Sequence, residues 1–480
     1  MISAVHSIHQ NRWFPHSALV TASPLRLSLR PGWFLSRLPR QFVVEPQEVG
    51  VYHCINRCVR RSMLCGWDPL TQRSYEHRQV WLQERLIFLA SVMAIDLEGF
   101  CTMGNHLHLI VRNRPDVAGK WSAEEIARKW LQLCPPYKPG TREVAETPSQ
   151  ADLDAILNNP ARVEQLRLRL SNPSWLMRFV TEKLARVANR EDQTTGRFWE
   201  GRFKMQRLLD EWAVAACLVY VDLNPIRAGL TNTLSQSEHT AVFERLAGVV
   251  HSFATTLSAQ QRQEYGLEAE ADVSSTPPAP AGAGDEARGG AIQTNDSLAS
   301  EIATSGSLTA PVTEAKAPAD SKAVDRSVWS RLPSDLVNEA SRQAAFDGPA
   351  AWLAPLEITE STLQQAVPGS RTSNLGCLNM TFTQYLELLE WTGRQVRAGK
   401  VGRIPAEEPP ILQQLGVAGE GWLKLVTSFH TKRGGLRRAI GRPAALEAEA
   451  VKRGQRWIQG IALSREIFGK TSGDRSPEAK

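Results

Sequence analysis

Two histidines separated by one residue are the strongest chemical signal in this sequence. His106 and His108 lie in the apolar run HLHLIV. In a β-strand, side chains at positions i and i+2 leave the same face, so both imidazoles would point to one side, close enough to bind one metal ion. Leu107, Leu109 and Val111 would point to the other side. The pattern predicts a strand that carries a metal site on one face and packs into a core with the other.

A tyrosine and an asparagine further along the chain could complete this site. They belong to the segment YVDLNP, as Tyr220 and Asn224. Asp210 is a suitable N-cap for a helix from Glu211 to about Leu223, which Pro225 would end. Residues four apart share one face of a helix. Two imidazoles and an amide oxygen leave a metal ion with open positions for phosphate oxygens, beside a phenol that needs activation to act as a nucleophile.

Each of these residues also has a structural explanation. A His-x-His pair in an arbitrary strand is more often structural or exposed than a metal ligand. Tyr220 by itself would be a core tyrosine with its hydroxyl satisfied, and Asn224 a helix-terminal residue before proline. The chemical interpretation therefore depends on the four residues being brought together.

The elements that must position these residues follow from apolar periodicity and turn residues. A helical elaboration is expected at about 114–174, between the histidine strand and a strongly amphipathic helix. The fold class is α+β, an antiparallel sheet with helices on one face. In chain order, the expected elements are strand 51–57, helix 76–94, strand 98–103, a turn at 104–105, the histidine strand, helices 122–133, 150–157, 161–170 and 175–190, and the tyrosine helix.

Cations alternate with aromatic residues just before the tyrosine helix, in the segment GRFWEGRFKMQR. The alternative to a DNA-binding role is a solvated basic face with some of the aromatic rings in the core. Interleaved rings make stacking on unpaired bases plausible. The predicted DNA-binding residues are Arg186, Arg190, Arg197, Trp199, Arg202, Lys204 and Arg207. A weaker patch of His430, Lys432, Arg433, Arg437, Arg438 and Arg442 is predicted as an accessory DNA contact.

Over about residues 45–235 these motifs resemble the REP-associated branch of the single-tyrosine HUH transposases. GNHLHLIV is similar to the HUH motif, and YVDLNPIRAG to the tyrosine helix of that family. The resemblance implies a ferredoxin-like α+β domain, Mg²⁺ or Mn²⁺ bound by His106, His108 and Asn224, and Tyr220 as the nucleophile. The implied activity is that of a transposase-type single-stranded DNA endonuclease and strand transferase. It would form a 5′-phosphotyrosine intermediate, near DNA hairpins.

Composition divides the chain into four predicted regions. Residues 1–44 are a basic, poorly ordered leader, and 45–240 are the HUH-like domain with its insertion. No aromatic residue occurs between Gly266 and Val328, so 266–326 is predicted to be a disordered linker. Aromatic residues then return in a mainly helical accessory domain, 327–470. Neither the long insertion nor the region after the linker has a counterpart in a minimal transposase.

Charge and cysteine content are compatible with these expectations. The net charge is +6 over 480 residues, which suits a polyanionic partner only mildly. The seven cysteines are irregularly spaced, which favours a reducing cytoplasm. No apolar run reaches the length of a membrane span, so no membrane partner is expected. The expected partner is hairpin-forming single-stranded DNA, and a homodimer is left open.

Two other functions fit parts of the pattern. A non-catalytic regulator could keep the same fold and bind hairpin DNA, although it would not need all four site residues. A histidine-triad nucleotide hydrolase would need a third histidine where Ile110 stands, which nearly excludes it.

Overall fold

The structure is a computed structural model. It describes residues 43–59, 63–69, 71–138, 141, 144–145, 147–231, 233–264, 332–396, 409–415, 417–430 and 436–468. Almost all of the predicted leader at 1–44 and the whole of the predicted linker at 266–326 lie outside the described residues.

A five-stranded sheet is the centre of the fold. Its strand order is β4-β5-β1-β6-β7, and every neighbouring pair is antiparallel except β6 and β7, which are parallel. This confirms the α+β class. The strands are β1 (Gly50–Arg57), β4 (Ile95–Met103), β5 (His106–Asn113), β6 (Lys204–Leu208) and β7 (Ala439–Ile440), and a separate hairpin pairs β2 (Trp67–Asp68) with β3 (Arg73–Ser74).

The first face of the sheet is covered by the helix that follows the β2–β3 hairpin, by the helices of the insertion and by the amphipathic helix after it. Leu107, Leu109 and Val111 of β5 are fully buried in this core, as their spacing predicts. Ser122 and Ser149 begin two of the helices with capping boxes, in which side chain and backbone satisfy each other's polar groups. The helices are α1 (His77–Val92), α2 (Pro115–Ala118), α3 (Ala123–Leu133), α4 (Gln150–Leu157), α5 (Pro160–Leu170) and α6 (Pro173–Glu191).

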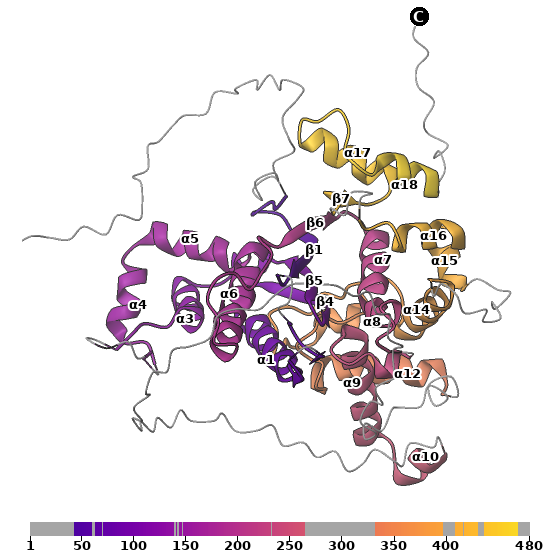
Figure 1. Ribbon diagram of the computed structural model, residues 1–480, viewed down its shortest axis with the longest axis horizontal. Coiled ribbons are helices and arrows are strands. Elements are labelled where there is room, and N and C mark those ends of the chain that lie inside the picture. The colour runs from indigo at the N-terminus through magenta and orange to yellow at the C-terminus, as the bar shows by residue number, and fades with distance from the viewer. Residues whose placement is uncertain are drawn as a thin grey trace, which may run out of the picture. The chain divides into compact units, whose positions relative to one another are not determined.

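The second face of the sheet is covered by α7 (Glu211–Asp222), so helices flank the sheet on both sides (Figure 1). The sequence analysis expected helices on one face. The difference has a simple cause: every residue of α7 from Trp212 to Asp222 is buried. A helix that is apolar on all sides needs partners all round. The sheet therefore covers one side of α7, and other helices must cover the rest.

The C-terminal segment, whose described residues lie between 332 and 468, supplies much of that cover. It is mainly helical, as expected. Side chains from α7 and from this segment form one continuous hydrophobic cluster. Its elements are α12 (Ser334–Asp347), α13 (Glu360–Gln364), α14 (Phe382–Val396), α15 (Pro410–Gln414), α16 (Gly419–Val426), α17 (Pro443–Lys452) and α18 (Ile461–Phe468). Between α7 and residue 264 lie α8 (Asn224–Arg227), a 3₁₀ turn η2 (Leu234–Gln236), α9 (Ala241–Thr256) and α10 (Ala259–Glu264).

Buried polar contacts also tie the C-terminal segment to the sheet and to α7. Arg112 of β5 donates to the carbonyl oxygen of Gly376 at 2.8 Å and pairs with Asp96 at 2.8 Å. The hydroxyl of Tyr385 donates to Asp222 Oδ2 at 2.6 Å. Because an unpaired polar group in the interior costs about 1–3 kcal/mol, these contacts fix how the segment docks.

No helix among the described residues is both long and apolar enough to span a membrane. All seven cysteines are unpaired thiols, and Cys134 is exposed whereas the others are buried.

Candidate active site

Strand register places three histidines on the face of the sheet that α7 covers. In the β1–β5 ladder, His108 lies opposite Ile55, and His53 opposite Ile110. Cross-strand partners share a face, and so do residues two apart along a strand. His53 and His106 therefore join His108 on this face, and the expected common orientation of the two β5 histidines is realised: their ring centroids are 4.9 Å apart.

Both nitrogens of the His108 ring have partners. Its Nε2 lies 3.1 Å from Nδ2 of Asn224, and its Nδ1 lies 3.0 Å from Nε2 of His53. His106 is held differently, because its Nδ1 lies 2.7 Å from Oδ1 of the neighbouring Asn105. Each β5 histidine thus has its Nδ1 engaged by the protein, and this orients its Nε2.

Tyr220 lies beside this histidine cluster. The centroid of the Tyr220 ring is 5.7 Å from that of His108. The Arg227 guanidinium lies over the Tyr220 ring, 5.0 Å from its centroid. Two residues of the C-terminal segment complete its surroundings. The Phe429 ring stacks on Tyr220 at 4.9 Å, and Nε2 of His430 lies 3.1 Å from the Tyr220 hydroxyl oxygen. Only 8% of Tyr220 is exposed.

The local sequence explains how α7 presents this tyrosine. Asp210 caps the helix by accepting a hydrogen bond from the Ala213 N–H at 2.9 Å, as predicted. The helix ends at Asp222, and Leu223 joins it to α8 in a helical conformation, so Asn224 stays on the side of Tyr220. Proline fits the first turn of α8 because its missing N–H would have no helical partner there.

Burial controls the protonation of the site. It lowers the pKa of His53 to about 3 and that of His106 to about 4, and it holds the pKa of His108 well below its ordinary value. All three imidazoles are therefore neutral at pH 7. Burial also raises the pKa of the Tyr220 hydroxyl to about 12, against the nearby Arg227 charge. The phenol is protonated at rest and must lose its proton to become an efficient nucleophile.

The donor groups fit a divalent cation whose coordination is completed from outside the protein. Metal-binding histidines commonly donate their second ring N–H to another group, as the Nδ1 contacts of His106 and His108 allow. Two donors ~2.1 Å from an octahedral ion lie ~3 Å apart when adjacent, close to the 3.1 Å between His108 Nε2 and the Asn224 amide. Rotation of that amide would present Oδ1 instead of Nδ2. Within the described part of the chain, no cluster of three or more His, Cys, Asp and Glu side chains is placed to hold a metal, so this donor set would need the amide.

The predicted DNA-binding residues are in several environments. Arg186, Arg190, Arg197 and Arg202 are exposed, the first two on α6 and the others in the segment before β6. Arg186 pairs with Glu182. Lys204 is half-buried and lies opposite Ile55 in the ladder, on the histidine face.

The last two predicted DNA-binding residues are engaged within the protein. The Trp199 indole donates to the Thr181 carbonyl oxygen at 2.9 Å. Arg207 is buried, lies on the opposite face of the sheet from the histidines, and pairs with Glu449 of α17 at 3.3 Å. The structure therefore brings Tyr220, His106, His108 and Asn224 together, but leaves Arg207 outside that group.

Three further residues of the site were not selected by the sequence analysis: His53, Arg227 and Phe429. His430 was selected only as part of an accessory DNA-binding patch, not as a neighbour of Tyr220. His53 could have been found from the strand pairing, because its position relative to His108 depends only on register. Arg227 follows Tyr220 by seven residues, or about two helical turns, so helical spacing could have indicated it. No local signal predicts that Phe429 and His430 contact Tyr220, since these contacts arise from packing between distant segments.

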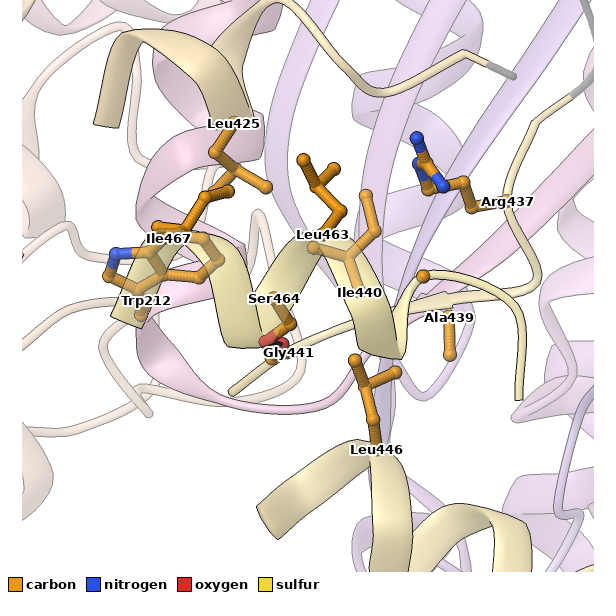
Figure 2. A pocket seen from close by; sticks show the side chains of 11 residues that line it. Trp212, Leu425, Arg437, Ala439, Ile440, Gly441, Leu446, Leu463, Ser464 and Ile467 are labelled. Carbon is orange, nitrogen blue, oxygen red and sulfur yellow. Dashed lines mark hydrogen bonds between the residues drawn. The ribbon is translucent and has the colours of Figure 1, made fainter. Parts of the chain in front are cut away.

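A narrow cleft near the start of α7 is a separate feature. Figure 2 shows that Trp212, Ile440, Leu446 and Ile467 line it. Its volume of about 10 Å³ accommodates no more than about one water molecule. Trp212 and Tyr220 are eight residues apart on the helix, or ~12 Å, so this cleft is not part of the histidine site.

Comparisons with known proteins add little to this geometry. No known protein family and no curated protein sequence matches the chain. A solved structure of a REP-associated tyrosine transposase bound to a REP hairpin aligns with 41% of this chain and 79% of that chain. The sequence identity is 11% and the TM-score is 0.25. A similarity this distant decides neither fold nor function.

Proposed function

We propose that this protein is a metal-dependent single-stranded DNA endonuclease and strand transferase with Tyr220 as its nucleophile. The single observation that supports this most is the meeting of His108, Asn224 and Tyr220. These residues come from β5 and from the α7–α8 junction, and their side chains gather within hydrogen-bond or ring-contact distance. The motif resemblance found in the sequence agrees with this choice of chemistry.

In this proposal, His106, His108 and Asn224 hold Mg²⁺ or Mn²⁺, which when bound neutralises and polarises a DNA phosphate. The phenolic oxygen of Tyr220 attacks phosphorus and forms a 5′-phosphotyrosine, and the 3′-oxygen leaves. The covalent link conserves the energy of the broken bond, so another 3′-hydroxyl can reverse the reaction. Strand transfer would then need no nucleotide cofactor.

In this proposal, exposed arginines of α6 and of the segment before β6 bind the DNA strand. Arg190, Arg197 and Arg202 are exposed and can contact phosphates. Arg186 would first have to give up part of its pairing with Glu182, an exposed contact worth less than about 1 kcal/mol. Hairpin-forming single-stranded DNA is the proposed substrate.

The test is covalent trapping. The full chain is incubated with hairpin-bearing single-stranded DNA and Mn²⁺, and a denaturing gel is examined for a protein–DNA adduct. The adduct should form with the wild type and with Tyr137→Phe, a change at an exposed tyrosine, but not with Tyr220→Phe. DNA binding without any adduct across a range of hairpins would favour the non-catalytic regulator instead.

A further inference from the structure

The C-terminal segment places a titratable side chain, His430, next to the proposed nucleophile Tyr220. Phe429 is fully buried and stacks on the Tyr220 ring at an interplanar angle of 29°. His430 follows it directly and is held by a backbone bridge to Leu436. The buried phenylalanine and this bridge hold the backbone of His430 beside Tyr220.

We propose that His430 is the general base that accepts the Tyr220 proton when the tyrosine attacks DNA, a step that rests on the proposed function. The geometry points to this role because Nε2 of His430 lies 3.1 Å from the phenolic oxygen, within the range for direct proton transfer. His430 is also exposed, so the proton can pass on to water. The C-terminal segment is then part of the catalytic site.

Other polar groups near the phenol are less suited to this task. Asn224 also hydrogen-bonds the Tyr220 hydroxyl, but an amide does not accept a proton at neutral pH. His108 has both ring nitrogens engaged, by His53 and by Asn224. Burial lowers the pKa of His430, so its imidazole is neutral at pH 7 and can accept.

The proton balance of the step is complete. As the oxygen of Tyr220 bonds to phosphorus, its proton moves to Nε2 of His430. The bond from phosphorus to the 3′-oxygen breaks, and this oxygen takes a proton from solvent. In the reverse reaction, a 3′-hydroxyl attacks the phosphotyrosine and loses its proton to solvent, while His430 returns a proton to the departing Tyr220 oxygen.

The test measures the single-turnover rate of adduct formation with Mn²⁺ and hairpin-bearing single-stranded DNA. His430→Ala and His430→Gln should each slow the reaction about 10²-fold or more, without changing DNA binding. Gln keeps a hydrogen-bond acceptor but cannot take the proton. Because position 430 is exposed, added imidazole should restore part of the rate of His430→Ala. His251→Ala, a change at an exposed histidine of α9, should react as the wild type does with and without imidazole.

Several outcomes would overturn the inference. An unchanged rate in both His430 variants would exclude a base at this position. A faster rate would mean that His430 restrains Tyr220 rather than activating it, and a loss that imidazole does not restore would indicate a positioning role. The complete absence of adduct with wild-type protein would instead refute the proposed function itself.

Discussion

The imidazole of His53 lies against that of His108, with Nε2 of the first 3.0 Å from Nδ1 of the second and the ring centroids 5.2 Å apart. Both rings are neutral, so a single proton occupies the hydrogen bond between them. When His108 donates, its Nε2 keeps a lone pair, which is the state a metal ligand requires. His53 therefore acts on the proposed metal through the tautomer of His108.

Replacing His53 should weaken metal binding. His53→Phe keeps a ring in this fully buried position but removes the partner of His108, and loss of such a partner typically lowers metal affinity about 10–100-fold. The measurement is the Mn²⁺ concentration that gives half-maximal adduct, with calorimetric Mn²⁺ titration as a second readout. Ile55→Val, on the same face of β1, should bind Mn²⁺ as the wild type does. Unchanged affinity in His53→Phe would mean that His53 only packs.

The distance between α7 and the sheet should depend on Gly99. A Cβ atom here would lie 2.7 Å from Leu218 Cδ2 of α7 and 3.3 Å from Ile110 Cδ1. Gly99→Ala should therefore destabilise the fold by about 1–3 kcal/mol through overpacking and slow adduct formation by shifting Tyr220. Gly104→Ala is the matched control, because its nearest contact would be an ordinary 3.6 Å. Equal urea midpoints for the two variants would contradict this account.

Removing the C-terminal segment should expose the outer side of α7. The centroid of the Trp212 ring lies 4.3 Å from that of Phe468 and 6.3 Å from that of Trp422. Leu223, just after α7, packs so closely on Gly393 of α14 that a Cβ atom at position 393 would lie 3.1 Å from Leu223 Cδ2. A fragment of residues 43–264 should therefore aggregate, or bind a hydrophobic dye and unfold without a cooperative transition. Gel filtration and thermal unfolding would show this. A monodisperse, cooperatively folded fragment would support an independent accessory domain at 327–470.

The stability of the protein should depend on the protonation of Glu244 in α9. Burial raises the pKa of this half-buried carboxyl from 4.5 to about 7, against a hydrogen bond from Gln83. A raised folded-state pKa favours the protonated form, so its contribution is complete below pH 4.5 and is lost as the pH rises through 7. Glu244→Gln removes this dependence.

From pH 5 to pH 8 the wild type should lose about 2–3 kcal/mol of unfolding free energy relative to the Glu244→Gln variant. Urea unfolding at the two pH values measures this difference. Glu264→Gln, a change at an exposed glutamate, is the control: the difference in unfolding free energy between this variant and the wild type should not change with pH. A gap between wild type and Glu244→Gln that stays constant with pH would show that the Glu244 pKa is not raised.

Local spacing was enough to predict much of the fold. The strand at β1, the helices α3 to α7 and the histidine strand lie close to their predicted positions, because apolar periods and capping residues act over a few neighbours. The same reasoning placed His106 with His108, and Tyr220 with Asn224. Each pair depends only on the geometry of one strand or one helical run.

Tertiary structure decided the rest. Only the register of β1 against β5 brings His53 to His108, and only the docking of the C-terminal segment brings Phe429 and His430 to Tyr220. Arg207 looked like its neighbouring cations in sequence but is buried against Glu449. These relationships join residues far apart in the chain, and they are set by which apolar surfaces must be covered together. A local pattern carries no information on that choice of partner.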